Sequence, residues 1–287
     1  MWAKQLNKNP TPKELNQWIN EADAIVVGIG AGMTSADGIG YSGKRFESNF
    51  PDFIKEYRFL DMLQASLYHF PSWQTYWAFQ SRFMDLNYFS QPAGESFINL
   101  LEILKGKEYF IITTNSDSSL EVAGFDQQKV FYIQGKYNLL QCSAMCHQQR
   151  YQMDDLIKEM ISKQENMQVP YELLPHCPKC DAFLEVNKRV AYKGMAEDDQ
   201  FFAEKARYDE FIKKSSNKKV LFWELGVGYT TPQLIKIPFW EMTKSNKNAL
   251  YIAMNAKNYR VDKEILDRTI AINDDINAFM KQLKKEI

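Results

Sequence analysis

The chain has 287 residues, of which 45% are hydrophobic and 14% aromatic, enough to bury one large core or two smaller ones. Its formal net charge of -1 and pI near 6.4 give no electrostatic reason to expect nucleic acid or an anionic membrane as a partner. The first residues lack an apolar signal core and no segment approaches about 18 uninterrupted apolar residues, so we expect a cytoplasmic protein that binds small molecules or other proteins.

The first element in the chain is a predicted helix from Pro12 to about Ala22. Thr11 suits its N-cap, Pro12 suits its first turn, and Glu14 can complete a capping box.

A glycine turn follows, within the stretch from Ala24 to Tyr41. An apolar run there meets glycines at every second position, Gly28, Gly30 and Gly32. A buried strand followed by a turn without Cβ atoms lets backbone N–H groups approach a phosphate, and a helix beginning at about Met33 would point its positive end toward it. A nucleotide site is the first hypothesis. A strand and tight loop without a ligand is the alternative, because lone glycine triplets also match by chance.

The segment from Lys44 to Phe89 is dense in aromatic residues, and Pro51 and Pro71 divide it into short helical pieces. Rings at helical spacing more often form a core than a ligand box, although a helical insert could also wall off a pocket. His69 has no catalytic partner nearby in the sequence, and we interpret it as structural.

The rest of the chain alternates strands and helices, which predicts an α/β fold with a Rossmann-like, doubly wound parallel sheet. A helical stretch from Ala93 to Lys105 precedes the next strand. Polar residues follow that strand, where ligands bind in such sheets. The strands expected after the glycine turn, with the residues that end them, are Tyr109 to Thr113 (Thr114 to Asp117), Val130 to Ile133 (Gln134-Gly135), Val220 to Leu225 (Gly226-Val227-Gly228), Leu250 to Ala253 (Asn255) and Thr269 to Ile272, before a C-terminal helix.

The four cysteines of the chain lie in two close pairs, in a region where the alternation of strands and helices breaks down. Cys142 and Cys146 form one pair, and Cys177 and Cys180 form the other. Two such pairs can hold zinc tetrahedrally, so we expect a structural zinc ribbon; unpaired or disulfide thiols are the alternative. The neighbouring histidines, His147 and His176, could substitute as ligands. Four thiolates leave no position for a water, so the metal would not be catalytic.

These motifs together resemble the sirtuin (Sir2) family over nearly the whole chain. A dehydrogenase is disfavoured, because Met33 stands where G-x-G-x-x-G, counted from Gly28, would have its third glycine. In the family's order, the matching residues are Gly30-Ala31-Gly32-Met33-Thr34 with Asp37-Gly38-Ile39, Thr113-Thr114-Asn115-Ser116-Asp117, Gln134-Gly135, the four cysteines, Gly226-Val227-Gly228 and Met254-Asn255.

The resemblance implies that NAD is bound as a cosubstrate whose bond to nicotinamide is broken. By motif match, Asp117 would hold the carboxamide of nicotinamide and Asn115 would orient the ribose or a water beneath it. A helix N-cap for residues 118–124 is the alternative for Asp117. The other cofactor contacts that the resemblance implies are Gly30, Ala31, Gly32 and Thr34 on the phosphates, Gly226, Gly228 and Asn255 on the phosphate and adenosine side, and the loop at Ile272 as a cap over the adenine.

One departure bears on the reaction. The family's general base is a histidine, and Gln134 stands in its place. A glutamine amide can orient a ribose hydroxyl but cannot take its proton, so the second half of deacylation should fail. Transfer of ADP-ribose to a side-chain nucleophile needs no such base. The family's Pro-Asp-Phe-Arg run is also replaced, by residues 40–43, and Arg45 is a candidate for the lost cation.

These features resemble the macrodomain-linked class M of microbial sirtuins, which implies a protein ADP-ribosyltransferase with Asn115 and Gln134 as catalytic residues. The resemblance also implies a protein substrate, with a lipoylated carrier related to the glycine cleavage H protein as the candidate. An NAD-dependent deacylase and a non-catalytic NAD-sensing module are the alternatives.

We expect three structural regions. The NAD-binding domain takes residues 1–43, 91–135 and 214–287, a helical insert takes 44–90, and a zinc-ribbon insert takes 136–213.

Overall fold

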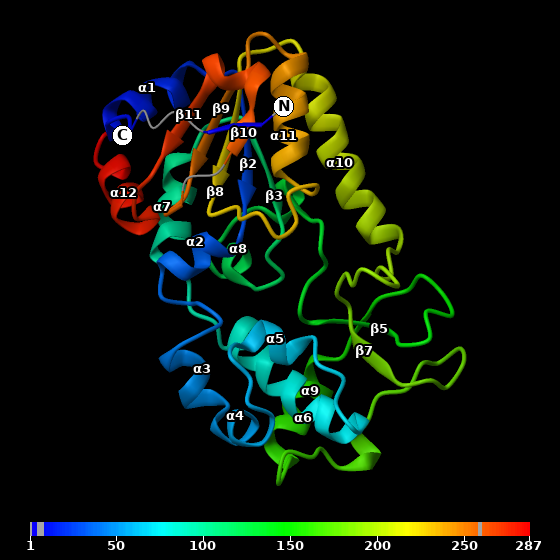
Figure 1. Cartoon of the computed structure of the whole chain (residues 1–287). Helices are drawn as coiled ribbons and strands as arrows, with labels where there is room; N and C mark the ends of the chain where they lie inside the picture. Colours follow the sequence, from blue (N-terminus) through cyan, green and yellow to red (C-terminus); the bar gives the residue numbers. More distant parts are fainter. Residues whose placement is uncertain (1, 5–8, 258–259) are drawn as a thin grey trace.

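The protein is described by a computed structural model that covers residues 2–4, 9–257 and 260–287 (Figure 1). Its larger part is built on a six-stranded sheet with the order β11-β9-β8-β2-β3-β4, in which every neighbouring pair is parallel. The predicted doubly wound α/β fold is confirmed. The strands are β2 (Ala24–Ile29), β3 (Tyr109–Thr113), β4 (Val130–Tyr132), β8 (Val220–Leu225), β9 (Leu250–Met254) and β11 (Thr269–Ile272).

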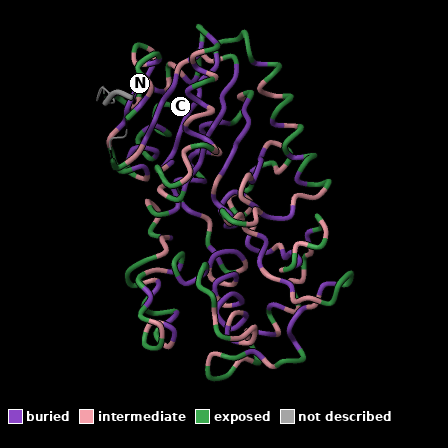
Figure 2. The backbone as a smooth tube through the Cα atoms, turned by 45° about the vertical axis from the view of Figure 1, so that its right-hand side comes forward, coloured by how far each residue is buried: buried purple, intermediate pink, exposed green. Residues whose placement is uncertain are grey.

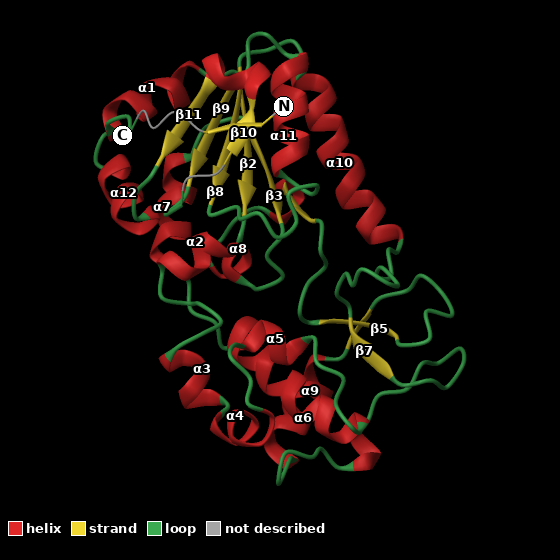
Figure 3. Ribbon diagram, viewed as in Figure 1, coloured by secondary structure: helices red, strands yellow, loops and turns green. Residues whose placement is uncertain are grey.

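Helices cover both faces of this sheet (Figure 3). Alternate residues of β2 explain the two layers: Ile25 and Val27 pack into one hydrophobic cluster, and Ala24 and Val26 pack into the other. All residues of the two central strands, β2 and β8, are buried, as the tube in Figure 2 also shows. The first face carries α1 (Pro12–Glu21), α7 (Glu95–Ile103) and α12 (Ile276–Lys284), and the second carries α10 (Asp199–Ser215) and α11 (Lys236–Ser245).

Helix α1 begins as predicted. The backbone N–H of Thr11 donates to Glu14 Oε2 at 2.7 Å, and the Thr11 hydroxyl accepts from the N–H of Glu14 at 3.2 Å, which completes the capping box. The helix after the glycine turn, α2 (Ala31–Ala36), begins two residues before the expected Met33, because Gly30 already serves as its N-cap.

The aromatic segment forms a second core, as predicted. Rings from the whole segment pack together with Cys142, Cys177 and apolar residues of the later insert. His69, interpreted as structural, is exposed. The helices of this unit are α3 (Lys44–Asn49), α4 (Pro51–Tyr57), α5 (Met62–Ser66), α6 (Trp73–Met84), the π-helical turn η1 (Asp85–Phe89), α9 (Asp154–Lys163) and the 3-10 turn η3 (Tyr171–Leu173).

A small antiparallel sheet completes this second unit, with the order β6-β5-β7. Its strands are β5 (Leu139–Cys142), β6 (Tyr151–Gln152) and β7 (Leu184–Val186). Helix α10 leaves this unit and packs on β3 and β4 of the large sheet, with Phe201 and Tyr208 in its core. The domain boundaries stay a prediction, and we propose that the zinc-ribbon insert ends before α10 and not at residue 213.

The remaining short elements lie on the large part of the molecule. They are the antiparallel pair β1 (Trp2–Lys4) and β10 (Arg260–Asp262), the helix α8 (Ser119–Val122), and the 3-10 turns η2 (Gln127–Lys129) and η4 (Lys263–Arg268). Within the described ranges, no helix is both long and apolar enough to cross a membrane.

Candidate active site

A pocket of about 620 Å³ lies at the carboxyl ends of the large sheet's strands. This is the edge where doubly wound sheets bind ligands, since the loops after neighbouring parallel strands meet there. Most of the predicted cofactor and catalytic residues line it: Gly30, Ala31, Gly32, Asn115, Gln134, Gly226, Gly228 and Asn255.

Two glycine turns touch through their backbones at the centre of this edge. The N–H of Gly32 donates to the carbonyl of Gly226 at 3.0 Å. A Cβ on Gly30 would lie 2.7 Å from that same carbonyl oxygen, and a Cβ on Gly226 would lie 2.2 Å from the N atom of Met33. Gly226 also has a φ of +64°, in the region that disfavours side chains. The glycines are therefore required first for packing of the two turns, and the N–H of Gly32 is already engaged.

A buried polar network connects the predicted ribose and nicotinamide residues. Asn115 Nδ2 donates to the hydroxyl of Thr34 at 2.9 Å, and that hydroxyl donates to Asp117 Oδ2 at 3.4 Å. Thr34 and Asp117 are only 5% and 3% exposed, and they lie behind the pocket wall, not in it. The network holds the Asn115 amide from behind, while Asn115 itself lines the pocket.

Asp117 is not the N-cap of the following helix, the alternative suggested by the sequence, because Ser118 occupies that position. Asp117 Oδ1 accepts from the backbone N–H of Ser119 at 3.0 Å and from Gln91 Nε2 at 3.2 Å. Burial raises the pKa of the Asp117 carboxyl, and the hydrogen bonds from Ser119, Gln91 and Thr34 act in the opposite direction. Gln91 is thus a further support of this carboxylate, from a position with no sequence motif.

Gln134 follows β4 and reaches across the pocket wall. Its Nε2 donates to the hydroxyl of Thr231 at 3.2 Å, which connects the turn after β4 with the loop after β8. Both residues line the pocket. An amide here can donate and accept hydrogen bonds but cannot act as a base at neutral pH.

Asn255 and Ile272 sit together at the other end of the edge, but in different roles. Asn255 lines the pocket, and its Nδ2 donates to the carbonyl of Val227 at 3.2 Å. Ile272 is 1% exposed and packs in the core of the sheet, so its side chain cannot cover an adenine. Its carbonyl instead accepts the backbone N–H of Asn255 at 3.0 Å. The expectation that the loop at Ile272 caps the adenine stays a prediction, in which the buried side chain of Ile272 takes no direct part.

Two of the three described cationic residues that line the pocket come from a segment that the sequence did not single out; the third is Lys257, in the loop after β9. Lys188 and Arg189, which follow β7, both line the pocket, and Arg189 is braced by Glu197 at 2.6 Å. Burial lowers the pKa of Lys188 to about 8, and its Nζ donates to the carbonyl of Ser66. Arg45, the candidate proposed from the sequence, does not line the pocket; its guanidinium donates to Asn87 Oδ1 and to the carbonyls of Gly40 and Leu86.

Two tyrosines also reach the pocket without a motif. The hydroxyls of Tyr41 and Tyr137 lie 2.8 Å apart, although 96 residues separate them in the chain. Only the folded structure brings this pair together.

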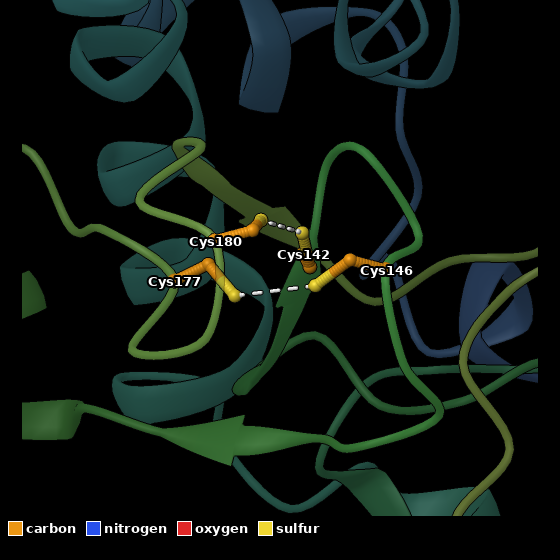
Figure 4. Close-up of side chains that lie close together, drawn as sticks. All are labelled: Cys142, Cys146, Cys177 and Cys180. Atoms are coloured by element: carbon orange, nitrogen blue, oxygen red, sulfur yellow. Dashed lines mark hydrogen bonds between the residues drawn. The ribbon is translucent and has the colours of Figure 1, made fainter.

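The four cysteines converge as the sequence predicted (Figure 4). All four Sγ atoms lie within 4.8 Å of one another. The Cys142–Cys180 and Cys146–Cys177 sulfur distances are 3.5 and 3.6 Å, close to the roughly 3.8 Å edge of a tetrahedron with Zn–S bonds of about 2.3 Å. The thiol set fits a structural zinc ion.

Neither histidine is needed as a substitute ligand. His147 Nδ1 lies 3.0 Å from the sulfur of Cys146, and His147 Nε2 lies 2.6 Å from the Tyr151 hydroxyl. His176 Nδ1 instead donates to the carbonyl of Asp181.

Solved structures with the same architecture are sirtuins. A Sir2 protein with a p53 peptide and NAD+ superposes with a TM-score of 0.58 at 20% identity, covering 96% of this chain and 98% of that one. A Sir2 protein bound to an acetylated peptide gives a TM-score of 0.57 at 20% identity, with the same coverage of 96% and 98%. The chain therefore has the sirtuin fold.

Two named relatives define the family more closely; no family model matches the sequence. A protein ADP-ribosyltransferase of Staphylococcus aureus is 52% identical over 273 residues, which cover 95% of this chain and 87% of the relative. A probable bifunctional ADP-ribose hydrolase/ADP-ribosyltransferase of Fusarium oxysporum f. sp. cubense is 25% identical over 235 residues, covering 77% of this chain and 38% of the relative. The chain belongs to the sirtuin-family ADP-ribosyltransferases and is an NAD-dependent transferase, as the resemblance had implied.

Proposed function

We propose that this enzyme transfers ADP-ribose from NAD to a side chain of an acceptor protein and releases nicotinamide. The observation that carries the proposal is the position of Gln134 on the pocket wall. Its amide cannot accept a proton at neutral pH, whereas the other residues that match the sirtuin motifs and line this pocket are ones that bind NAD in the family. The 52% identical relative, named a protein ADP-ribosyltransferase, supports it.

The proposed reaction depends on holding the ribose of NAD in the correct orientation, and it needs no general base to take a proton from a ribose hydroxyl. The bond between C1′ of the nicotinamide ribose and the pyridinium nitrogen breaks, and its electron pair leaves with nicotinamide. A lone pair of the acceptor side chain forms the new bond to C1′, and any proton it carries passes to solvent. In this scheme Asn115, fixed by Thr34, and Gln134, fixed by Thr231, orient the ribose hydroxyls.

We assign the remaining cofactor contacts by motif match and position. Gly30, Ala31 and Gly226 take the phosphates, and Asn255 takes the adenosine side. Thr34 acts from behind the pocket wall through Asn115 and Asp117, and the assignment of Asp117 to the carboxamide of nicotinamide rests on motif match alone. Gly32 and Gly228 shape the turns. The four thiolates hold a structural zinc ion and take no part in the reaction.

The acceptor protein that we propose is a lipoylated carrier related to the glycine cleavage H protein. Support comes from the class M resemblance alone. The structures of Sir2 proteins with bound peptides support a protein substrate in general.

Labelled NAD tests the proposed reaction. The enzyme is incubated with NAD labelled in the adenylate half and with purified carrier protein, with and without its lipoyl group; NAD labelled in the nicotinamide ring is the control. We expect label on the carrier from the first NAD and none from the second. Gln134→Ala and Asn115→Ala should both weaken the labelling.

A parallel assay with an acetyl-lysine peptide separates the alternative reaction. Efficient deacetylation by the wild type would favour a deacylase and overturn the transferase proposal. Absence of protein-bound label with the carrier and with a whole-cell lysate would favour the non-catalytic module.

A further inference from the structure

The hydroxyl pair of Tyr41 and Tyr137 forms part of the pocket wall that the assignments above leave without a role. Tyr41 lies in the loop after α2, and Tyr137 lies in the turn after β4, three residues beyond Gln134. Both side chains line the pocket, and Tyr137 is 8% exposed. Their hydroxyl oxygens are 2.8 Å apart.

The pair is held beside Ser116, which also lines the pocket. The backbone N–H of Tyr137 donates to the carbonyl of Ser116 at 2.9 Å. Phe83 of α6 packs against both rings, with centroid distances of 6.1 Å to Tyr41 and 4.8 Å to Tyr137. The two hydroxyls are therefore fixed in place by the second core before any ligand binds.

One hydroxyl proton of the tyrosine pair is free to donate a hydrogen bond to a ligand. Each hydroxyl has one proton, and one of the two protons is used in the bond between them. Within the described residues, the other hydroxyl has no further acceptor. Burial raises the pKa of Tyr41 most, followed by the neighbouring Tyr137 and then the charge of Asp117; burial is also the main cause that raises the pKa of Tyr137. Both hydroxyls thus stay protonated across the physiological range.

We propose that the Tyr41–Tyr137 pair donates this remaining hydrogen bond to the carboxamide oxygen of nicotinamide in bound NAD. The inference rests on the proposed function, since it takes NAD as the cosubstrate. A primary carboxamide carries one acceptor, its oxygen, and a fixed hydroxyl donor on the pocket wall matches that acceptor. In the proposed function, the amides of Asn115 and Gln134 bind the ribose hydroxyls, so the tyrosine donor is left for the carboxamide. The pair is a positioning and specificity element for the leaving group.

Binding measurements test this without any acceptor protein. Isothermal titration compares the wild type with the double variant Tyr41→Phe/Tyr137→Phe, using NAD and ADP-ribose as ligands. We expect the Kd for NAD to rise about 10-fold, the size of one lost hydrogen bond, while the Kd for ADP-ribose, which lacks nicotinamide, stays within about 2-fold. Equal weakening for both ligands would indicate a structural role only, and no change for either would also overturn the proposal.

The two single variants show which hydroxyl meets the ligand. One of Tyr41→Phe and Tyr137→Phe should reproduce the double variant, and the other should have a smaller effect. Tyr57→Phe is the matched control, because Tyr57 belongs to the same aromatic core but does not line the pocket. Its affinity for NAD should equal that of the wild type.

A cofactor analogue provides a measurement that would not change if the two tyrosines had only a structural role. Thionicotinamide adenine dinucleotide carries sulfur, a weaker acceptor, in place of the carboxamide oxygen. The wild type should prefer NAD over this analogue, and the double variant should lose most of that preference. A preference that survives in a folded double variant would overturn the inference, whereas failure of protein labelling with these affinities intact would count against the transferase proposal alone.

Discussion

Replacing Gly226 by Ala should destabilise the protein through the contact between its two glycine turns. The new Cβ would lie 2.2 Å from the N atom of Met33 and 2.7 Å from the Cα of Gly32, and both are backbone atoms that no rotamer change can move away. The residue also has a φ of +64°. The left-handed conformation costs about 1–2 kcal/mol and overpacking about 1–3 kcal/mol, so the free energy of unfolding should fall by about 2–5 kcal/mol.

Gly106 offers a matched control for the backbone part of this effect. Its φ is +73°, but a Cβ there would meet nothing within 4 Å. Gly106→Ala should therefore cost only the conformational share, about 1–2 kcal/mol. Urea unfolding of both variants gives the difference, which is the cost of separating the turns.

Titration with NAD then connects this packing with the site. Because Gly226 and Gly32 both line the pocket, turns pushed apart should bind NAD more weakly in Gly226→Ala and normally in Gly106→Ala. Equal losses of stability in the two variants, together with unchanged NAD affinity, would refute the idea that close approach of the turns shapes the site.

Four further substitutions test the metal site, the residues at the reacting ribose and Lys188 in the pocket. Cys177→Ser should release close to one zinc ion per chain and lower the melting temperature, as measured by elemental analysis and calorimetry; a folded wild type without zinc would contradict it. Gln134→Ala should slow ADP-ribosyl transfer, and Asn115→Ala, which lies within the buried network, should slow it more; single-turnover rates would reveal the reverse order if the assignment is wrong. NAD affinity should fall as pH rises through the pKa of Lys188 near 8, because its positive charge is lost, and Lys188→Met should flatten that dependence.

The large sheet could be predicted from the sequence because its strands are buried on both faces. Such strands read as uninterrupted apolar runs, and the polar or glycine residues that end them mark the ligand edge. The aromatic segment from Lys44 to Phe89 and the cysteine pairs were equally informative. Aromatic rings at helical spacing usually form a core, and two close cysteine pairs usually bind zinc. Most of the cofactor and catalytic residues predicted from these local signals do line the pocket.

The residues that were missed reach the pocket through tertiary packing. Lys188 and Arg189 stand in no motif, and they arrive there because β7 pairs with β5 in the small sheet. Tyr41 and Tyr137 meet across 96 residues. Ile272 illustrates the same point: a residue at the end of a buried strand can point into the core or toward the ligand, and a motif match does not distinguish the two.

The position of the cysteines suggests why a zinc ribbon is inserted at this point of the sheet. Cys142 ends β5, directly opposite Leu184 of β7, and the chain reaches Lys188 four residues later. The amine of Lys188 contacts the carbonyl of Ser66 at the end of α5, while Arg189 donates to the carbonyl of Ile133, next to Gln134. Fixing β5 against β7 therefore also fixes Lys188 and Arg189 relative to both the helical insert and the turn that carries Gln134. The metal would thus act on the reaction only through position, which is consistent with a closed four-thiolate site.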